Sequence, residues 1–140
     1  MNRLARLLVP FAVAATLAGC NIKQSFEKAD AAIGTFHADL AAGSYDRIWM
    51  TADPDLRQSS SKADFEKLLQ AVHDKLGAVK ETKQTGWNTN ATTGGTYLTA
   101  VMQTTFEKGT GTEQFTYRKG KDDTVTLVNY AIDSRDMMLN

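Results

Sequence analysis

The sequence predicts an α+β domain in which helices, one of them long, pack on a curved antiparallel sheet of about four strands. The chain has 140 residues, which suits one domain rather than two. Up to Lys80, alanine is frequent and apolar residues recur every three or four positions, as in helices with one buried side. Beyond Lys80 lie 14 of the 17 threonines, and threonine favours strands. Helices followed by a run of strands are typical of the α+β class.

Three helices are predicted in the first half of the chain. The first spans about residues 22–42, where six apolar side chains recur at helical spacing. A short second helix follows Ser44 and ends at Asp53-Pro54. The third follows Ser61, a residue type that caps helix N-termini, and Gly77 stops it.

Four strands are predicted in the second half, at about residues 78–88, 96–107, 112–118 and 124–133. Turns that contain glycine separate the later strands, whereas a polar loop at 88–95 separates the first two.

Two strands show their buried face by alternation. Phe115 and Tyr117 share one face of the third strand. In the last strand Val128, Tyr130 and Ile132 alternate inward, while Val125 and Leu127 begin on the opposite face. Either a bulge lies between them or both faces are partly covered.

Residues 1–20 have the features of a cleaved leader. Arg3 and Arg6 precede an apolar run from Leu7 to Leu17, which is shorter than the roughly 20 residues that a membrane span needs. Leu17-Ala18-Gly19-Cys20 then resembles the lipobox of bacterial lipoproteins. The resemblance implies that a diacylglyceryl group joins the Cys20 thiol, that cleavage follows Gly19, and that fatty acids such as palmitate hold the protein on the membrane. An N-terminal helix with a buried cysteine does not explain these features together.

The chain therefore divides into a signal peptide, residues 1–19, and a single lipid-anchored domain, residues 20–140. Removal of the leader leaves fourteen basic against sixteen acidic side chains, so lipid rather than charge is expected to hold the domain on the membrane. Asn21 follows the anchor. In enteric bacteria an aspartate at that position commonly signals inner-membrane retention, so Asn21 favours the outer membrane, with the domain facing the periplasm.

Composition excludes several classes of function. Sixteen basic and sixteen acidic residues in the whole chain lack the basic excess of a nucleic-acid binder. One cysteine excludes an intramolecular disulfide and a multi-cysteine zinc site. His37 and His73 lie beside rather than on the apolar stripes of their helices, so both are expected at or near the solvent. No metal site and no cofactor are predicted.

The order and spacing of the elements resemble the cystatin-like, nuclear-transport-factor-2-like superfamily. The resemblance rests on residues 36–49 (FHADLAAGSYDRIW), on 65–77 with its final KLG, and on the hairpins around Gly109 and Gly120. It is strongest to small envelope lipoproteins of unknown function. It implies a sheet that wraps the long helix as a cone, whose open end often holds a ligand.

Five aromatic residues are candidates to line such a cone, although core packing explains Tyr117 and Tyr130 equally: Tyr45, Trp49, Tyr97, Tyr117 and Tyr130. Some members of the superfamily are isomerases or dehydratases that use a buried Asp or His base and a Tyr donor. Asp46 and Asp133 are the candidate carboxylates here.

No catalytic residues can be assigned, so the leading hypothesis is a non-catalytic module that binds a protein, a peptide or a small ligand. One alternative is a small-molecule isomerase or hydratase with a carboxylate buried in the cone. Another is an envelope inhibitor or immunity protein that inserts the loop 88–95 into a hydrolase. The expected partners are the membrane, through Cys20, and a second copy of the chain if one face of the sheet is uncovered.

Overall fold

A computed structural model describes residues 18–140, with side chains from Ile22 onward. The predicted signal peptide, residues 1–19, lies outside the described residues except for its last two, and so does the side chain of Cys20. Among the described residues no helix is both long and apolar enough to cross a membrane.

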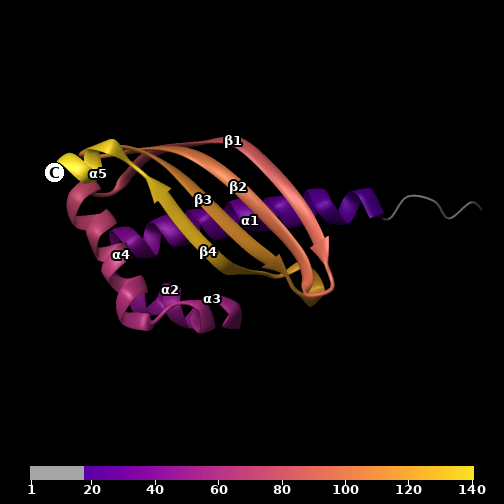
Figure 1. Cartoon of the computed structure of the whole chain (residues 1–140). Coiled ribbons are helices and arrows are strands. Elements are labelled where there is room, and N and C mark those ends of the chain that lie inside the picture. Colours follow the sequence, from indigo (N-terminus) through magenta and orange to yellow (C-terminus); the bar gives the residue numbers. More distant parts are fainter. Residues whose placement is uncertain (1–17) are drawn as a thin grey trace, which may run out of the picture.

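Helices packed on one antiparallel sheet form the domain, so the predicted α+β class is confirmed. The strands arch over the long first helix, and the shorter helices gather near its C-terminal end (Figure 1). The helices are α1 (Ala18–Ala41), α2 (Tyr45–Thr51), α3 (Pro54–Ser59), α4 (Lys62–Leu76) and α5 (Arg135–Leu139). The strands are β1 (Val79–Thr92), β2 (Gly95–Phe106), β3 (Gly109–Lys119) and β4 (Val125–Asp133), and the 3-10 turn η1 (Lys121–Asp123) precedes β4.

The sheet is a meander in which each strand pairs with its neighbour along the chain, in the order β1-β2-β3-β4. The pairing of β2 with β3 is continuous from Thr96↔Lys119 to Phe106↔Gly109. The pairing of β3 with β4 slips by one residue at Val128, which faces no partner. This bulge brings both Leu127 and Tyr130 into the core, which confirms the first of the two explanations for the last strand.

The core lies between α1 and the concave face of the sheet. Phe36 of α1 packs edge-on against Phe115 of β3, with ring centroids 5.0 Å apart. On the other side of the core, α4 buries Leu69, Val72 and Leu76 completely. Ser61 caps α4 by accepting a hydrogen bond from an amide in its first turn, as the sequence predicts.

One sequence prediction about a loop is wrong, and one helix boundary has a second role. Residues 88–92 belong to β1, which pairs with β2 up to Thr92↔Gly95, so the predicted polar loop at 88–95 shrinks to a turn at Thr93-Gly94. Its polar composition reflects exposure of this end of β1 rather than a loop. Asp53-Pro54 ends α2 but also starts α3, because Asp53 caps that helix and proline is accommodated at a first helical position.

Candidate functional site

A cavity of about 210 Å³ lies between α1, α2 and the last two strands. Most of its wall is apolar, with Ile48 of α2 facing Val125 and Leu127 of β4. The complete lining consists of Ala32, Thr35, Phe36, Asp39, Ile48, Thr51, Tyr117, Val125 and Leu127. For comparison, an apolar cavity of about 150 Å³ can hold benzene. The cavity therefore has room for a group the size of one aromatic ring.

Asp39 is the one charged residue among the described residues that line this cavity. Its side chain is 11% exposed, and Oδ1 accepts a hydrogen bond of 3.0 Å from Nη1 of Arg47. The Arg47 side chain, on α2, is 67% exposed and is free to leave the carboxylate at little cost. The cavity thus combines an apolar wall with a carboxylate whose present partner is exchangeable.

A second feature is a carboxylate, that of Glu113 on β3, which is completely buried. Its Oε1 accepts a hydrogen bond of 2.6 Å from Thr104 and lies 2.8 Å from Nε2 of His37. Its Oε2 accepts a hydrogen bond of 2.8 Å from the Tyr130 hydroxyl. A buried charge is tolerated when it is hydrogen-bonded in this way, because the donors replace the water that the charge has lost.

The donors around Glu113 are themselves ordered. Thr104 gives its hydroxyl proton to Glu113, so the Thr82 hydroxyl, 2.9 Å away, must be the donor in the contact between the two threonines. Burial, and then the charge of Glu113, raise the pKa of Tyr130 well above its ordinary value. Tyr130 therefore remains protonated and donates to Glu113 at physiological pH.

The Glu113 cluster corrects two expectations from the sequence. His37 is only 8% exposed, so the prediction that it lies at or near the solvent is wrong: Glu113 is its partner across the core. Asp46 and Asp133, the candidate carboxylates, are both exposed, and Asp46 pairs with Lys62 on the surface. Glu113 was missed although the alternation that places Phe115 and Tyr117 inward also places residue 113 inward.

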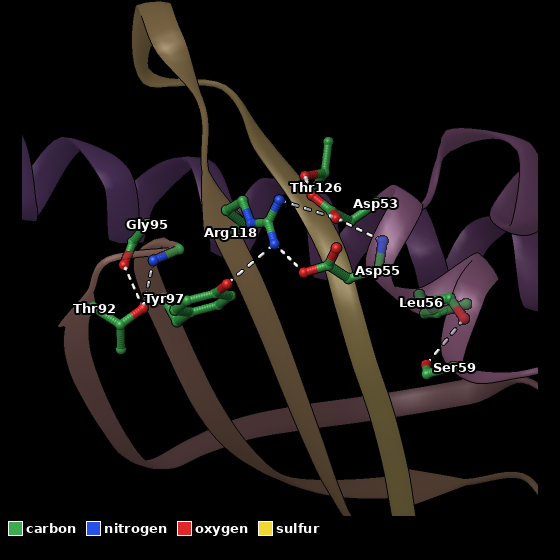
Figure 2. Close-up of polar contacts among 10 residues, drawn as sticks. Asp53, Asp55, Leu56, Ser59, Thr92, Gly95, Tyr97, Arg118 and Thr126 are labelled. Atoms are coloured by element: carbon green, nitrogen blue, oxygen red, sulfur yellow. Dashed lines mark hydrogen bonds and ion pairs between the residues drawn. The ribbon is translucent and has the colours of Figure 1, made fainter.

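A third polar cluster attaches α3 to the sheet (Figure 2). Arg118 on β3 pairs with Asp55, donates a hydrogen bond of 3.0 Å to the Tyr97 hydroxyl, and places Nη1 3.5 Å from Asp53. Asp53 is 3% exposed, caps α3 and accepts a hydrogen bond of 2.7 Å from Thr126 of β4. Every acidic group in this cluster has a partner, so we assign the cluster to the positioning of α3.

The five aromatic residues predicted from the sequence do not meet in one place. Tyr117 lines the cavity, and Tyr130 belongs to the Glu113 cluster. Trp49 packs against Phe65 of α4, with ring centroids 5.9 Å apart. Tyr97 binds Arg118, as described above. The remaining one, Tyr45, lies half-buried against His73, with ring centroids 6.2 Å apart.

Among the described residues, no group of three or more His, Cys, Asp or Glu side chains is placed to hold a metal ion.

Comparison with known families matches residues 31–130 to DUF4019, described as a protein of unknown function. The match covers more than two thirds of the chain, so the chain belongs to this family. It includes the cavity and the Glu113 cluster, whereas Cys20 lies before it. No curated protein matches the sequence.

Proposed function

We propose, for this member of the DUF4019 family, a role as a lipid-anchored, non-catalytic module of the bacterial cell envelope that binds a small ligand. The anchor is Cys20, and the domain faces the periplasm, with Asn21 favouring the outer membrane. The observation that carries the binding role is the cavity beside Asp39, because an apolar recess with one directed polar group is the usual form of a small-molecule site.

The anchor is supported by the order of features in residues 1–20: two arginines, an apolar run, small residues and the only cysteine of the chain. Two or three acyl chains attach a protein durably, whereas one chain binds marginally. Cys20→Ser should therefore move the protein out of the membrane fraction or leave it unprocessed. Unchanged retention of the variant in washed membranes would contradict lipid anchoring.

The chemistry of the cavity defines the ligand class. The wall accepts an apolar body, and Asp39 accepts hydrogen bonds, with a preference for a cationic donor that replaces Arg47. We infer a ligand of about the size of one ring that carries an amine or another donor. A free small molecule and an apolar side chain of a peptide with a nearby amine share this chemistry.

Benzylamine and toluene test this assignment, because they share the ring and differ in the ammonium group. Saturation-transfer NMR should detect both on the wild type, with the stronger signal from benzylamine. Asp39→Asn should reduce the benzylamine signal to that of toluene. Ala32→Phe fills the cavity and should abolish both signals, whereas Ala31→Phe, at an exposed neighbouring position on α1, should abolish neither. Signals that survive Ala32→Phe, or none from the wild type, would contradict the binding site.

An isomerase or hydratase is the second candidate, and the meeting of Glu113, His37 and Tyr130 favours it. It ranks second because both carboxylate oxygens are already occupied and Glu113 does not line the cavity described above. Such an enzyme moves a proton at carbon, so incubation with an envelope extract in D₂O should place deuterium in a metabolite. Loss of that label in a Glu113→Gln preparation that circular dichroism shows to be folded would favour catalysis, and no label with the wild type would argue against it.

The third candidate, an inhibitor or immunity protein, also stays a prediction; the segment suggested for insertion, 88–95, is the tip of the β1–β2 hairpin, with its turn at Thr93-Gly94. A homodimer through the outer face of the sheet stays a prediction. Analytical ultracentrifugation in detergent, with the micelle matched in density, measures it directly.

A further inference from the structure

An exposed apolar surface lies at the N-terminal end of α1. Trp87 on β1 is 57% exposed, and its ring packs against Phe26 of α1 with centroids 4.2 Å apart. Ile22 is 45% exposed and lies one helical turn before Phe26, on the same side of α1. We call these three residues, Ile22, Phe26 and Trp87, the anchor-side patch.

A recess continues this patch toward the sheet. It has a volume of about 350 Å³, and its wall includes Ile22 of α1 and Leu98 of β2. Thr89 and Ala91, also in the wall, follow Trp87 at two-residue steps and so share its face of β1. Ile22 belongs to both the patch and the recess, so the two adjoin at the N-terminal end of α1. That end of α1 and the turn between β1 and β2 lie at the right in Figure 1.

We propose that the anchor-side patch rests in the headgroup layer of the membrane that holds Cys20. This inference rests on the lipid anchoring proposed above. Ile22 is two residues from Cys20, which is about 3 Å along a helix axis, so acyl chains on Cys20 keep the patch beside the bilayer. Tryptophan is enriched at membrane–water interfaces, where its ring is buried and its N–H stays hydrated.

The membrane is favoured over a second copy or a soluble partner by its proximity. A chain attached to the membrane through Cys20 meets that membrane intramolecularly. The effective concentration of the membrane surface at the patch is therefore higher than that of a partner in solution. The patch consists of apolar side chains, so contact with the membrane should persist at high salt. Asp39 lies about 25 Å from Ile22 along the axis of α1. Membrane contact at the patch therefore does not cover the cavity beside Asp39.

The chain offers a direct probe, because it has two tryptophans and Trp49 is buried. In the Trp49→Phe variant Trp87 alone fluoresces. The acylated variant, purified from membranes, is placed in phosphatidylcholine vesicles with and without brominated acyl chains. We expect brominated lipid to reduce Trp87 emission at least twofold and iodide in the buffer to quench it weakly. In the matched Trp87→Phe variant, buried Trp49 should respond to neither quencher.

Strong iodide quenching of Trp87 without quenching by brominated lipid would overturn the proposal. Protection from iodide that appears only at high protein density on the vesicles would also overturn it, since that result identifies a second copy as the occupant. If Trp49→Phe lowers the yield, the difference between wild type and Trp87→Phe supplies the same signal. Added salt should not change the quenching by brominated lipid.

The anchor and the patch can fail separately. Mass spectrometry of the purified protein reports whether Cys20 is acylated. If its thiol is free, the anchor is wrong, and because Cys20 is the only cysteine, a maleimide lipid attaches the chain to the same vesicles at the same residue. Quenching by brominated lipid in that arrangement supports the patch by itself. Acylated Cys20 with no such quenching refutes the patch while the anchor stands.

Discussion

Replacement of Glu113 by glutamine should destabilise the domain markedly. The carboxylate is completely buried and has donors on both oxygens: Thr104 and His37 on Oε1, and Tyr130 on Oε2. Glutamine keeps one acceptor oxygen and places an NH₂ group where the other was. The Tyr130 hydroxyl can turn to accept one amide hydrogen, but the second amide hydrogen is buried without a partner and the hydrogen bonds to a charged group are lost.

The magnitude follows from these losses. A hydrogen bond to a charged group contributes about 1.5–3 kcal/mol, and an unsatisfied buried donor costs about 1–3 kcal/mol. Glutamine is neutral, so it avoids part of the cost of burying a charge, which offsets some of the loss. We expect the free energy of unfolding to fall by about 3 kcal/mol, which corresponds to a melting temperature lower by about 10 °C for a domain of this size.

Urea unfolding followed by circular dichroism measures this change. Glu81→Gln is the matched control, because Glu81 is exposed on β1 and the chemical change is the same. The control should lie within about 0.5 kcal/mol of wild type. A Glu113→Gln variant as stable as the control would refute the assignment of Glu113 as a hydrogen-bonded core group. Tyr130→Phe removes one donor, and its effect should not add to that of Glu113→Gln, since both act on one bond.

Three further changes test other parts of the fold. Burial, and then the charge of Glu113, raise the pKa of Tyr117; the unfolded chain therefore loses this proton near pH 10 while the folded chain keeps it. The free energy of unfolding is unaffected below pH 10 and falls above it by about 1.4 kcal/mol per pH unit for each such tyrosine. Tyr117→Phe should reduce the slope of this alkaline decline by that amount, as measured by urea unfolding at several pH values. Gly34→Ala should raise the free energy of unfolding by about 0.5–1 kcal/mol, because alanine favours the helix and its Cβ would meet nothing within 4 Å. A lower melting temperature of the variant would contradict this open space around Gly34. Asp53→Ala should cost roughly 2 kcal/mol and Asp53→Asn less, because asparagine still caps α3 and can accept from Thr126; equal losses would show that the cap contributes little.

Regular patterns in the sequence determine the parts of the fold that were predicted. The apolar spacing of α1 and α4 and the alternation in β2 and β3 are local signals. Each places its residues on the face that the structure buries, except Ile22 at the N-terminal end of α1, which is exposed. The helices α3 and α5 have only six and five residues, which is too short for a periodic pattern to appear. The polar end of β1 lacks a buried face and therefore resembles a loop.

The site depends on contacts between distant parts of the sequence. Glu113 and His37 are 76 residues apart, and a buried glutamate has no signature unless its partners are known. Alternation does place Glu113 inward, but a polar residue among apolar ones equally suggests a strand end. The cavity beside Asp39 likewise needs the relative positions of α1, α2 and β4, which no local pattern specifies.

The outer edge of the sheet along β1 is irregular, and this irregularity bears on solubility. β1 has 14 residues, and its outer edge has no partner strand among the described residues. Its pairing with β2 slips at Lys80 and again at Thr85, and charged residues lie near the first slip. Bulges and charges of this kind prevent a straight edge from recruiting the edge of another molecule. Proteins confined to a membrane surface meet one another often and in similar orientations. On the membrane proposed above, an irregular edge would allow this chain to be crowded without forming intermolecular sheets.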